Sequence, residues 1–294
     1  MAHKLKIIYN KNIKIEREMI KITKKKREAI MKENKLRYHL EHDLPLLSTR
    51  LWSTQPFFWE TIGATGTFDY VEFVAEYAPY DFTDLPNMAR AAELNDMGTM
   101  IKLDFQNRGF VAQKAIQAGF QSIMFVDHVN PDQVRESVSL AKPKTAGSTG
   151  VFGYPNGRYI GGQSHIPPLD HVKRLNDIVL CFMIEKEEAV NNIEEICSIP
   201  GVDMIQFGPN DYCMSKGWNR ADHIAEFKEA ERKCIEVALA HGVRPRCEIV
   251  TPADAEYYVK LGVKDFSLGD QLAKMKAFWN GEGKEMRAIV DGLK

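Results

Sequence analysis

The chain has 294 residues, of which 27% are charged and 44% are hydrophobic, and its formal net charge at pH 7 is −1. This length allows one large α/β barrel or two smaller domains, and the composition is that of an ordinary globular protein. The nearly balanced charge argues against a dedicated nucleic-acid-binding protein, and no apolar run approaches the roughly 20 residues of a membrane-spanning helix.

The amino-terminal segment, residues 1–40, carries 13 Lys and Arg against four Glu. A transit peptide or a nucleic-acid-binding arm could have this charge, but the glutamates and the helical pattern favour a solvated helical extension that packs on a partner subunit. The apolar run LKII is too short for a secretory signal. We therefore predict a basic helical extension over residues 1–40 and one folded domain over residues 41–294.

Short apolar runs alternate with helical patterns through the rest of the chain. Strands are predicted at residues 44–52, 68–77, 99–105, 120–129, 179–185, 202–207, 243–249 and 263–270. Helices are predicted at residues 55–62, 84–94, 110–118, 132–141, 186–197, 222–241, 252–261 and 271–290. Eight strands alternating with helices predict a (β/α)8 TIM barrel. A doubly wound open sheet is the main competitor, but it would carry a glycine fingerprint after the first strand, and none is present.

The alternation is interrupted at residues 142–176, which are rich in Gly and Pro and contain no clear strand or long helix. A long loop inside a compact domain is usually functional, so we predict a lid over the pocket. Arg158 within this loop could contact an anionic substrate or lie on the surface.

Two carboxylates follow neighbouring predicted strands, Glu185 after VLCFMI and Asp211 after MIQFGPN. In parallel α/β sheets, residues at the carboxyl ends of strands converge on one site. Two hard oxygen ligands there suit Mg²⁺ or Mn²⁺. The structural alternative is that Glu185 is an acidic first-turn residue and Asp211 an N-cap or turn residue.

The five cysteines are scattered without a CxxC pair, which is typical of reduced core residues in a cytoplasmic protein. A zinc site built from them is not expected.

Three stretches resemble the 4-hydroxy-2-oxoheptanedioate aldolase family of metal-dependent, class II pyruvate aldolases. They are MIEKEEAVNNIEEICSIPGVDMIQFGPNDYCMSKG, FVAEYAPYD and ADAEYYVKLGVKDFSLGDQL. The resemblance extends from about residue 32 to residue 290, and it implies a TIM barrel whose last helix is swapped between the subunits of a trimer or hexamer.

By this resemblance, Glu185 and Asp211 are the ligands of a divalent metal, Mg²⁺, Mn²⁺ or Co²⁺. The family's cation chelates the carboxylate and keto oxygens of a 2-oxo acid such as pyruvate. The backbone N–H groups of Asn210 and Asp211, which follow Gly208 and Pro209, are expected to hold the substrate carboxylate, as a peptide nest can.

The chain departs from the family at three pocket positions. Tyr77 replaces the family's acid/base His, and a phenol that titrates near pH 10 is a poor base unless strongly perturbed. Lys102 replaces an Arg and lacks its bidentate fork. Met183 replaces a Gln beside the metal ligand. Glu76 matches a family Glu and is expected to orient metal-bound water.

A replacement base could be His128, at the carboxyl end of the fourth predicted strand, although a single His there is often structural. Tyr77 could instead donate a hydrogen bond to the aldehyde oxygen of the cleaved substrate, or pack at the barrel rim. Arg50, at the end of the first predicted strand, is expected to meet the aldehyde half.

The leading hypothesis is a metal-dependent lyase that cleaves a hydroxylated 2-oxo acid to pyruvate, or a related 2-oxo acid, and an aldehyde. The alternatives are an oxaloacetate decarboxylase or a citrate-lyase-like enzyme that uses the same enolate, and a non-catalytic barrel that binds metal and oxo acid. The expected partners are a small-molecule substrate and further copies of the chain, with no nucleic acid and no membrane.

Overall fold

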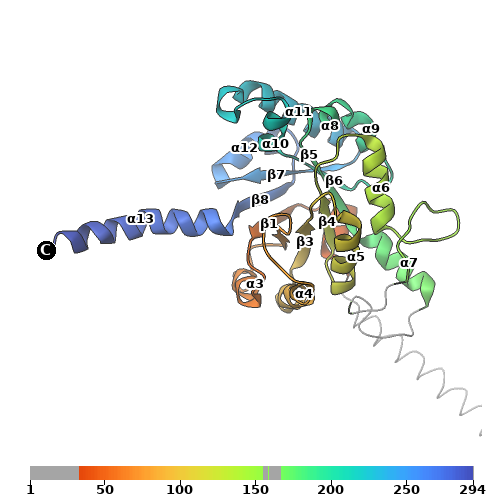
Figure 1. Cartoon of the computed structure of the whole chain (residues 1–294), viewed down its shortest axis with the longest axis horizontal. Coiled ribbons are helices and arrows are strands. Elements are labelled where there is room, and N and C mark those ends of the chain that lie inside the picture. Colours follow the sequence, from red (N-terminus) through yellow and green to blue (C-terminus); the bar gives the residue numbers. More distant parts are fainter. Residues whose placement is uncertain (1–32, 155–157, 159–166, 294) are drawn as a thin grey trace, which may run out of the picture.

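The computed structural model describes residues 33–154, 158 and 167–293. Its eight strands pair in parallel, each with its neighbours in the sequence, and β8 pairs with β1 to close a barrel. The predicted (β/α)8 barrel is therefore confirmed (Figure 1). The strands are β1 (Leu46–Leu51), β2 (Tyr70–Phe73), β3 (Gly98–Lys102), β4 (Ser122–Phe125), β5 (Val179–Ile184), β6 (Met204–Phe207), β7 (Arg244–Ile249) and β8 (Asp265–Asp270).

Helices surround the barrel, and those predicted from the sequence begin and end within a few residues of the expected positions. The helix after β5 is broken in two at Asn192, and β6 is followed by a short helix that was not predicted. The helices are α2 (Lys35–Glu41), α3 (Pro56–Gly63), α4 (Asp84–Leu94), α5 (Arg108–Ala118), α6 (Pro131–Ala141), α7 (Pro168–Asp177), α8 (Glu187–Asn191), α9 (Ile193–Cys197), α10 (Pro209–Ser215), α11 (Ile224–Ala240), α12 (Ala255–Lys260) and α13 (Gln271–Asp291).

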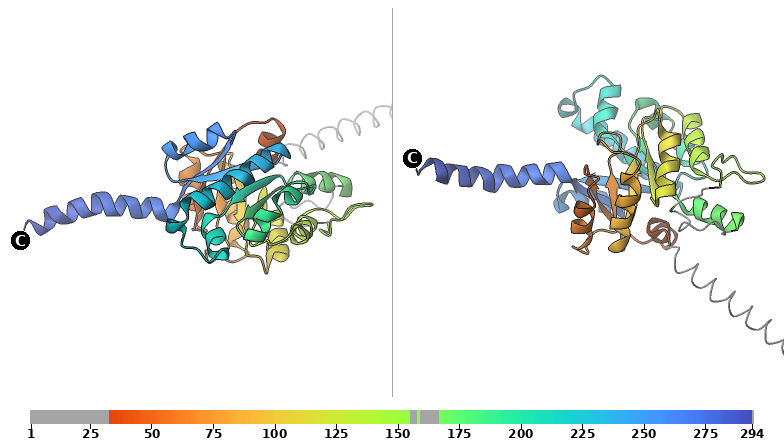
Figure 2. Two further views of the ribbon diagram at one scale, coloured as in Figure 1. Left: turned by 90° about the horizontal axis from the view of Figure 1, so that it is seen from above. Right: turned by 60° about the horizontal axis from the view of Figure 1, so that its bottom comes forward.

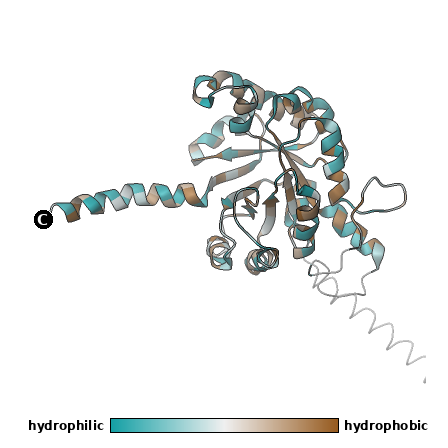
Figure 3. Ribbon diagram, viewed as in Figure 1, coloured by the Kyte–Doolittle hydropathy of each residue, from teal (hydrophilic) through white to brown (hydrophobic). Residues whose placement is uncertain are grey.

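The central strands are buried on both faces, which explains why their sequences are almost continuously apolar. Successive side chains point alternately outward and inward. Phe73 and Phe125 pack outward against the helices, whereas Met100, Met124 and Cys181 fill the barrel interior. In Figure 3 the central strands are accordingly brown, the colour of hydrophobic residues.

The amino end of the barrel is closed by α2. Leu36 is fully buried in the interior cluster, and the Asn34 side chain donates to the carbonyl oxygens of Gln121 at 2.7 Å and Asp177 at 2.8 Å. Arg37 forms a two-pronged ion pair with Asp203, at 2.8 and 2.7 Å. Residues 34–41 thus pack as part of the barrel. The proposed extension over residues 1–40 otherwise lies outside the described residues.

The segment between α6 and β5 corrects two predictions. It contains the ten-residue helix α7, and its described parts lie at the amino end of the barrel. Lys142 Nζ donates to the carbonyl oxygens of Asn176 and Ile178 at 2.8 Å, and Arg158 pairs with Glu93 near the end of α4. The predicted lid is wrong for these parts, because a connection from a helix back to a strand runs at the face opposite the active site.

The last helix, α13, projects away from the barrel and has no buried residue (Figures 1 and 2). Phe278 and Trp279 on this helix are more than half exposed, at 56% and 59%. None of the helices in the described residues is both long and apolar enough to cross a membrane. All five cysteines are buried and free, as the sequence predicted.

Candidate active site

A pocket of about 570 Å³ opens at the carboxyl ends of the strands. Most of the site residues predicted from the sequence line it, although they come from five different strands or the loops after them. These lining residues are Arg50, Tyr77, Lys102, Met183, Gly208, Pro209, Asn210 and Asp211. Glu76 and Glu185 do not line the pocket themselves, but Glu76 pairs with Lys102 and Glu185 lies against Gly208. His128 does not reach the pocket.

Glu185 directly follows β5 and is only 2% exposed. Its Oε1 accepts a hydrogen bond of 2.8 Å from the Asp127 backbone N–H. Burial raises the pKa of Glu185 to about 7, although this N–H and the charge of Lys102 act in the opposite direction. Lys186 Nζ lies 2.6 Å from Asp127 Oδ1 and 3.6 Å from Asp211 Oδ1, so it links two of the acids around the site.

The structural alternative does not describe Glu185, whereas Asp211 does lie in the first turn of a helix. The acidic residues in the first turn of α8 are Glu187 and Glu188, and Glu185 lies before the N-cap. Asp211 is in the first turn of α10, whose N-cap is Gly208, so it is not the N-cap residue itself.

The residues present fit a divalent cation. A Cβ atom on Gly208 would lie 2.7 Å from Glu185 Oε2, so a glycine is required to leave space for this carboxylate. A cation would offset the unfavourable burial of the charged Glu185. The described residues contain no group of three or more His, Cys, Asp or Glu suited to a metal. Two carboxylates with the remaining positions left to water and substrate is an arrangement typical of Mg²⁺.

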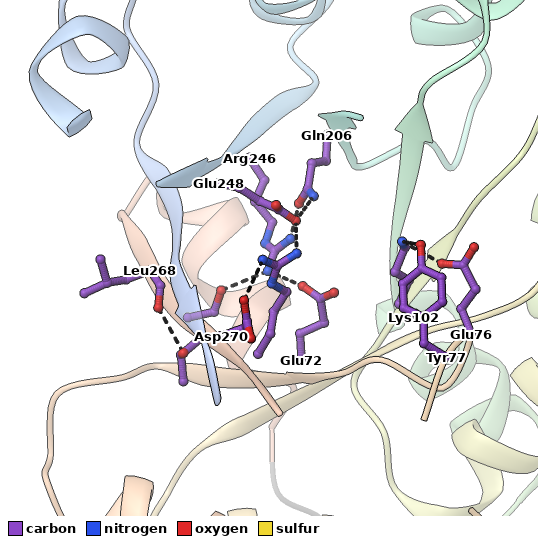
Figure 4. Close-up of polar contacts among 12 residues, drawn as sticks. Glu72, Glu76, Tyr77, Lys102, Gln206, Arg246, Glu248, Leu268 and Asp270 are labelled. Atoms are coloured by element: carbon purple, nitrogen blue, oxygen red, sulfur yellow. Dashed lines mark hydrogen bonds and ion pairs between the residues drawn. The ribbon is translucent and has the colours of Figure 1, made fainter. Parts of the chain in front are cut away.

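Lys102, at the end of β3, forms a cluster with Glu76 and Tyr77, called here the Lys102 cluster (Figure 4). Lys102 Nζ lies 2.6 Å from Glu76 Oε2 and donates to the Tyr77 hydroxyl at 2.9 Å. The Tyr77 ring stacks on Trp52 with 5.7 Å between the ring centroids. Glu76 was expected to orient metal-bound water, whereas in this structure it holds Lys102.

The electrostatics of the Lys102 cluster fix its charges near neutral pH. Burial opposes the charge on Lys102, but the attraction of Glu76 outweighs this effect and raises the pKa of Lys102 above its usual range. Burial raises the pKa of Tyr77 to about 12, although Lys102 opposes the rise. Lys102 is therefore cationic, and Tyr77 is a hydrogen-bond donor rather than a base.

The structure does not bring His128 to the pocket. Its side chain is 1% exposed, and its Nε2 lies 2.7 Å from Ser137 Oγ on α6, among the rings of Phe105, Phe125 and Phe182. Asp127 has a left-handed backbone conformation, with φ 60°, which interrupts the inward and outward alternation. Burial, aided by the charge of Arg108, lowers the pKa of His128 to about 4, so it is a neutral structural residue.

A second charged cluster lines the other side of the pocket, and only its Arg50 was predicted from the sequence. We call it the Arg50 cluster: Arg50 Nη1 lies 2.6 Å from Glu248 Oε1, and Arg50 Nη2 lies 3.6 Å from Asp270 Oδ2. Glu248 and Asp270 are at the carboxyl ends of β7 and β8. The signal that identified Glu185, an acid at the end of a strand, could have found both.

Beneath the Arg50 cluster, the fully buried Arg246 occupies the barrel interior (Figure 4). It forms an ion pair with Glu72 and donates to Gln206, to the Tyr70 hydroxyl at 2.7 Å and to Ser48 Oγ at 3.0 Å. Gln206 Nε2 in turn donates to Glu248 Oε1 at 2.6 Å. The interior network thus connects directly to the pocket.

A TIM barrel with a pair of acids and a buried lysine at the carboxyl ends of its strands belongs to the class of barrel enzymes that stabilise developing negative charge. Residues 61–271 match the model of the HpcH/HpaI aldolase/citrate lyase family, and the chain belongs to this family.

Two curated relatives are aldolases. The chain is 28% identical over 166 residues to a 2-dehydro-3,6-dideoxy-6-sulfogluconate aldolase of Pseudomonas putida, a match that covers 56% of this chain and 62% of the relative. It is 24% identical over 246 residues to a hydroxypyruvate/pyruvate aldolase of Paraburkholderia phytofirmans, covering 78% of this chain and 92% of the relative. The family and these relatives make the chain a carbon–carbon lyase, so the reading as a non-catalytic barrel is not supported.

Among solved structures, the chain resembles an HpcH/HpaI aldolase from Desulfitobacterium hafniense, with a TM-score of 0.75 and 22% identity. The superposition covers 86% of this chain and 96% of that one, which supports the same barrel fold.

Proposed function

We propose that this chain is a divalent-metal-dependent aldolase that cleaves a hydroxylated 2-oxo acid into pyruvate, or a related 2-oxo acid, and an aldehyde. The proposal rests above all on the buried Glu185 held beside Gly208 and Asp211, with the cationic Lys102 in the same pocket. This combination suits a reaction that develops negative charge on oxygen when a carbon–carbon bond breaks.

Glu185 and Asp211 would hold the cation, Mg²⁺, Mn²⁺ or Co²⁺. When bound, such a cation supplies Lewis-acid stabilisation of negative charge on a keto oxygen. The backbone N–H groups of Asn210 and Asp211, in the first turn of α10, have no partner within the helix and would bind the substrate carboxylate. Met183 would form an apolar wall beside the oxo acid.

The Lys102 cluster would serve the cleavage step. Lys102 places a fixed positive charge in the pocket, and Glu76 keeps it in position. The Tyr77 hydroxyl, which stays protonated, would donate a hydrogen bond to the oxygen that becomes the aldehyde. Both residues thus stabilise the negative charge on oxygen in the transition state more than they stabilise the ground state.

The test is metal dependence of pyruvate release from a hydroxylated 2-oxo acid. A chelator should abolish turnover, and added Mg²⁺, Mn²⁺ or Co²⁺ should restore it. Trapping of a Schiff base with borohydride, together with metal-independent turnover, would overturn the proposal. Glu185→Ala should also abolish turnover. Glu188→Ala is its matched control, because Glu188 lies three residues later in the chain and is exposed.

The same site could also serve oxaloacetate decarboxylation or cleavage of an acyl thioester, because both pass through an enolate. The family description includes citrate lyase, which keeps this alternative open. Pyruvate release from oxaloacetate and from the hydroxylated acids, assayed beside release of a shortened thioester from 3-hydroxyacyl thioesters, separates the three reactions.

We also propose that the protein is a homo-oligomer, a trimer or hexamer, located in the cytoplasm. The exposed apolar side chains of α13 need a partner surface, and a second copy of the chain would provide one. The five free cysteines suit a reducing compartment. Light scattering of the purified protein measures the oligomeric state, and a monomer at micromolar concentration would contradict this proposal.

A further inference from the structure

We propose that the Arg50 cluster is a second recognition subsite, which binds the hydroxyl groups of a neutral, polyhydroxylated aldehyde half and disfavours an aldehyde ending in a carboxylate. This inference rests on the proposed aldolase function and names the class of its second product. It concerns Arg50, Glu248 and Asp270, which all line the pocket. Glu248 and Asp270 lie across from the Lys102 cluster in Figure 4.

The cluster presents both donors and acceptors to the pocket. Glu248 uses Oε1 for both Arg50 and Gln206, and no hydrogen bond to its Oε2 is formed by the described residues. Arg50 Nη2 lies 3.6 Å from Asp270 Oδ2, which is beyond hydrogen-bond distance, so this nitrogen can donate to a ligand. A hydroxyl group can donate to a carboxylate and accept from a guanidinium at once, so it matches this pattern.

Charge decides between the possible aldehydes. The cluster holds two acids and one base, so a substrate carboxylate would meet Glu248 and Asp270 as like charges. An apolar chain would displace water from all three side chains without replacing its hydrogen bonds. A neutral chain with hydroxyl groups avoids both costs.

The acids are held in place before any substrate binds. Gln206, which positions Glu248, is itself held by Arg246, and the ion pair of Arg246 with Glu72 has no exposed side-chain surface. Asp270 caps α13 by accepting from the Ala273 N–H at 2.9 Å. A buried ion pair is weak evidence for stability, so we assign this network to positioning.

The pocket has room for such a substrate. Its volume of about 570 Å³ is within the range of sites for drug-sized ligands and far exceeds the needs of pyruvate alone. With the oxo acid at Asp211 and Lys102, the aldehyde half extends toward β7 and β8, where the Arg50 cluster lies.

The test runs the reaction in the condensation direction, with pyruvate and one of three acceptors: D-glyceraldehyde, propionaldehyde or succinic semialdehyde. We expect kcat/KM for D-glyceraldehyde to exceed that for either other acceptor by about tenfold or more, the effect of one hydrogen bond to a charged group. Glu248→Gln should lower the ratio of D-glyceraldehyde to propionaldehyde by about tenfold or more, mainly through KM. Asp270→Asn, which keeps the helix cap, should lower it in the same direction.

Glu256→Gln is the matched control, because Glu256 is exposed on α12, pairs with Lys260 and does not line the pocket. It should leave the ratio unchanged. A wild-type preference for succinic semialdehyde or propionaldehyde, or a ratio unaffected in both folded variants, would overturn the inference.

A separate readout distinguishes this failure from failure of the proposed function. Exchange of the pyruvate methyl protons for deuterium, followed by NMR without any aldehyde, reports enolate formation alone. Proton exchange in pyruvate without selectivity among the three aldehydes would contradict the subsite proposal and leave the aldolase proposal intact. The absence of metal-dependent exchange in the wild-type protein would overturn both.

Discussion

The two ends of the barrel are built from different chemistry. At the carboxyl end, charged side chains from five strands and their loops surround an open pocket, and some of their polar atoms have no partner among the described residues. At the amino end, α2 inserts Leu36 into the apolar interior and satisfies the neighbouring backbone with Asn34 and Arg37. Reactivity and stability are therefore separated along the barrel axis, and substitutions at the two ends should have opposite signatures.

The largest effect is expected from Glu185→Ala at the carboxyl end. It removes one of two proposed metal ligands, so turnover should fall by about a thousandfold or more. Stability should be equal or higher, because a carboxylate whose burial is unfavourable has been removed. Steady-state kinetics and thermal unfolding measure the two quantities. Lost turnover that merely follows lost folding would contradict the separation.

The converse is expected from Leu36→Ala at the amino end. Truncating this fully buried side chain should reduce the free energy of unfolding by about 2–5 kcal/mol, without changing kcat per folded molecule. Tyr38→Ala, at a partly exposed position on the same helix, should cost much less. Urea unfolding and active-site titration provide the comparison, and a fall in kcat of the folded Leu36→Ala protein would break it.

His128 lies at the end of a strand but outside the pocket, so substituting it should change the pH dependence of stability rather than catalysis. Its folded pKa of about 4 lies below the ordinary value of 6.5, so the unfolded chain takes up the proton first. Stability from this residue is complete above about pH 6.5 and is lost as the pH falls toward 4, by about 2 kcal/mol at pH 5.

The variant His128→Gln should remove most of this pH dependence while retaining a hydrogen bond to Ser137. The measurement is the free energy of unfolding at pH 7.5 and pH 5 for both proteins. Equal losses in the two proteins would show that His128 does not carry the effect.

The smallest effect is expected from Tyr77→Phe, which keeps the ring stacked on Trp52 and removes the hydroxyl bound to Lys102. Turnover should fall by about tenfold, the loss of one hydrogen bond in the transition state. Since the pKa of Tyr77 is about 12, the wild-type pH profile should show no rise from its ionisation below pH 10. A rise with a midpoint near pH 8 that Tyr77→Phe abolishes would instead identify Tyr77 as a base.

The barrel and the positions of Glu185 and Asp211 at its carboxyl end were predictable because their signals are local. Apolar runs of four to six residues mark strands buried on both faces. Glu185 directly follows β5, and Asp211 lies four residues after the end of β6. The shared face follows from topology alone, since all strands are parallel.

The errors arose where the signal was not local. The helix α7 was missed because only His171 and Leu175 on it are buried, too few to form a periodic pattern, and it starts within a proline-rich stretch. The lid was inferred from loop length, although the position of a loop between helix and strand already assigns it to the amino end.

The direction of side chains at the ends of strands was also predicted wrongly. His128 turns outward because Asp127 adopts a left-handed conformation, which Asp tolerates better than most residues but which its identity does not require. The pairing of Arg50 with Glu248 joins β1 to β7, 198 positions apart in the chain. No local pattern carries such a contact.

The interior of the barrel has a mechanical consequence for altering the enzyme. Arg246 binds side chains from β1, β2 and β6. Hydrogen bonds and an ion pair of fixed direction therefore hold this half of the barrel interior together. The interior between β3 and β5 is filled instead by Met100, Met124, Cys181 and Met183, whose flexible or soft side chains adapt to changes in shape. The half beneath the Lys102 cluster can therefore absorb substitutions by repacking, whereas the half beneath the Arg50 cluster must be redesigned as one unit.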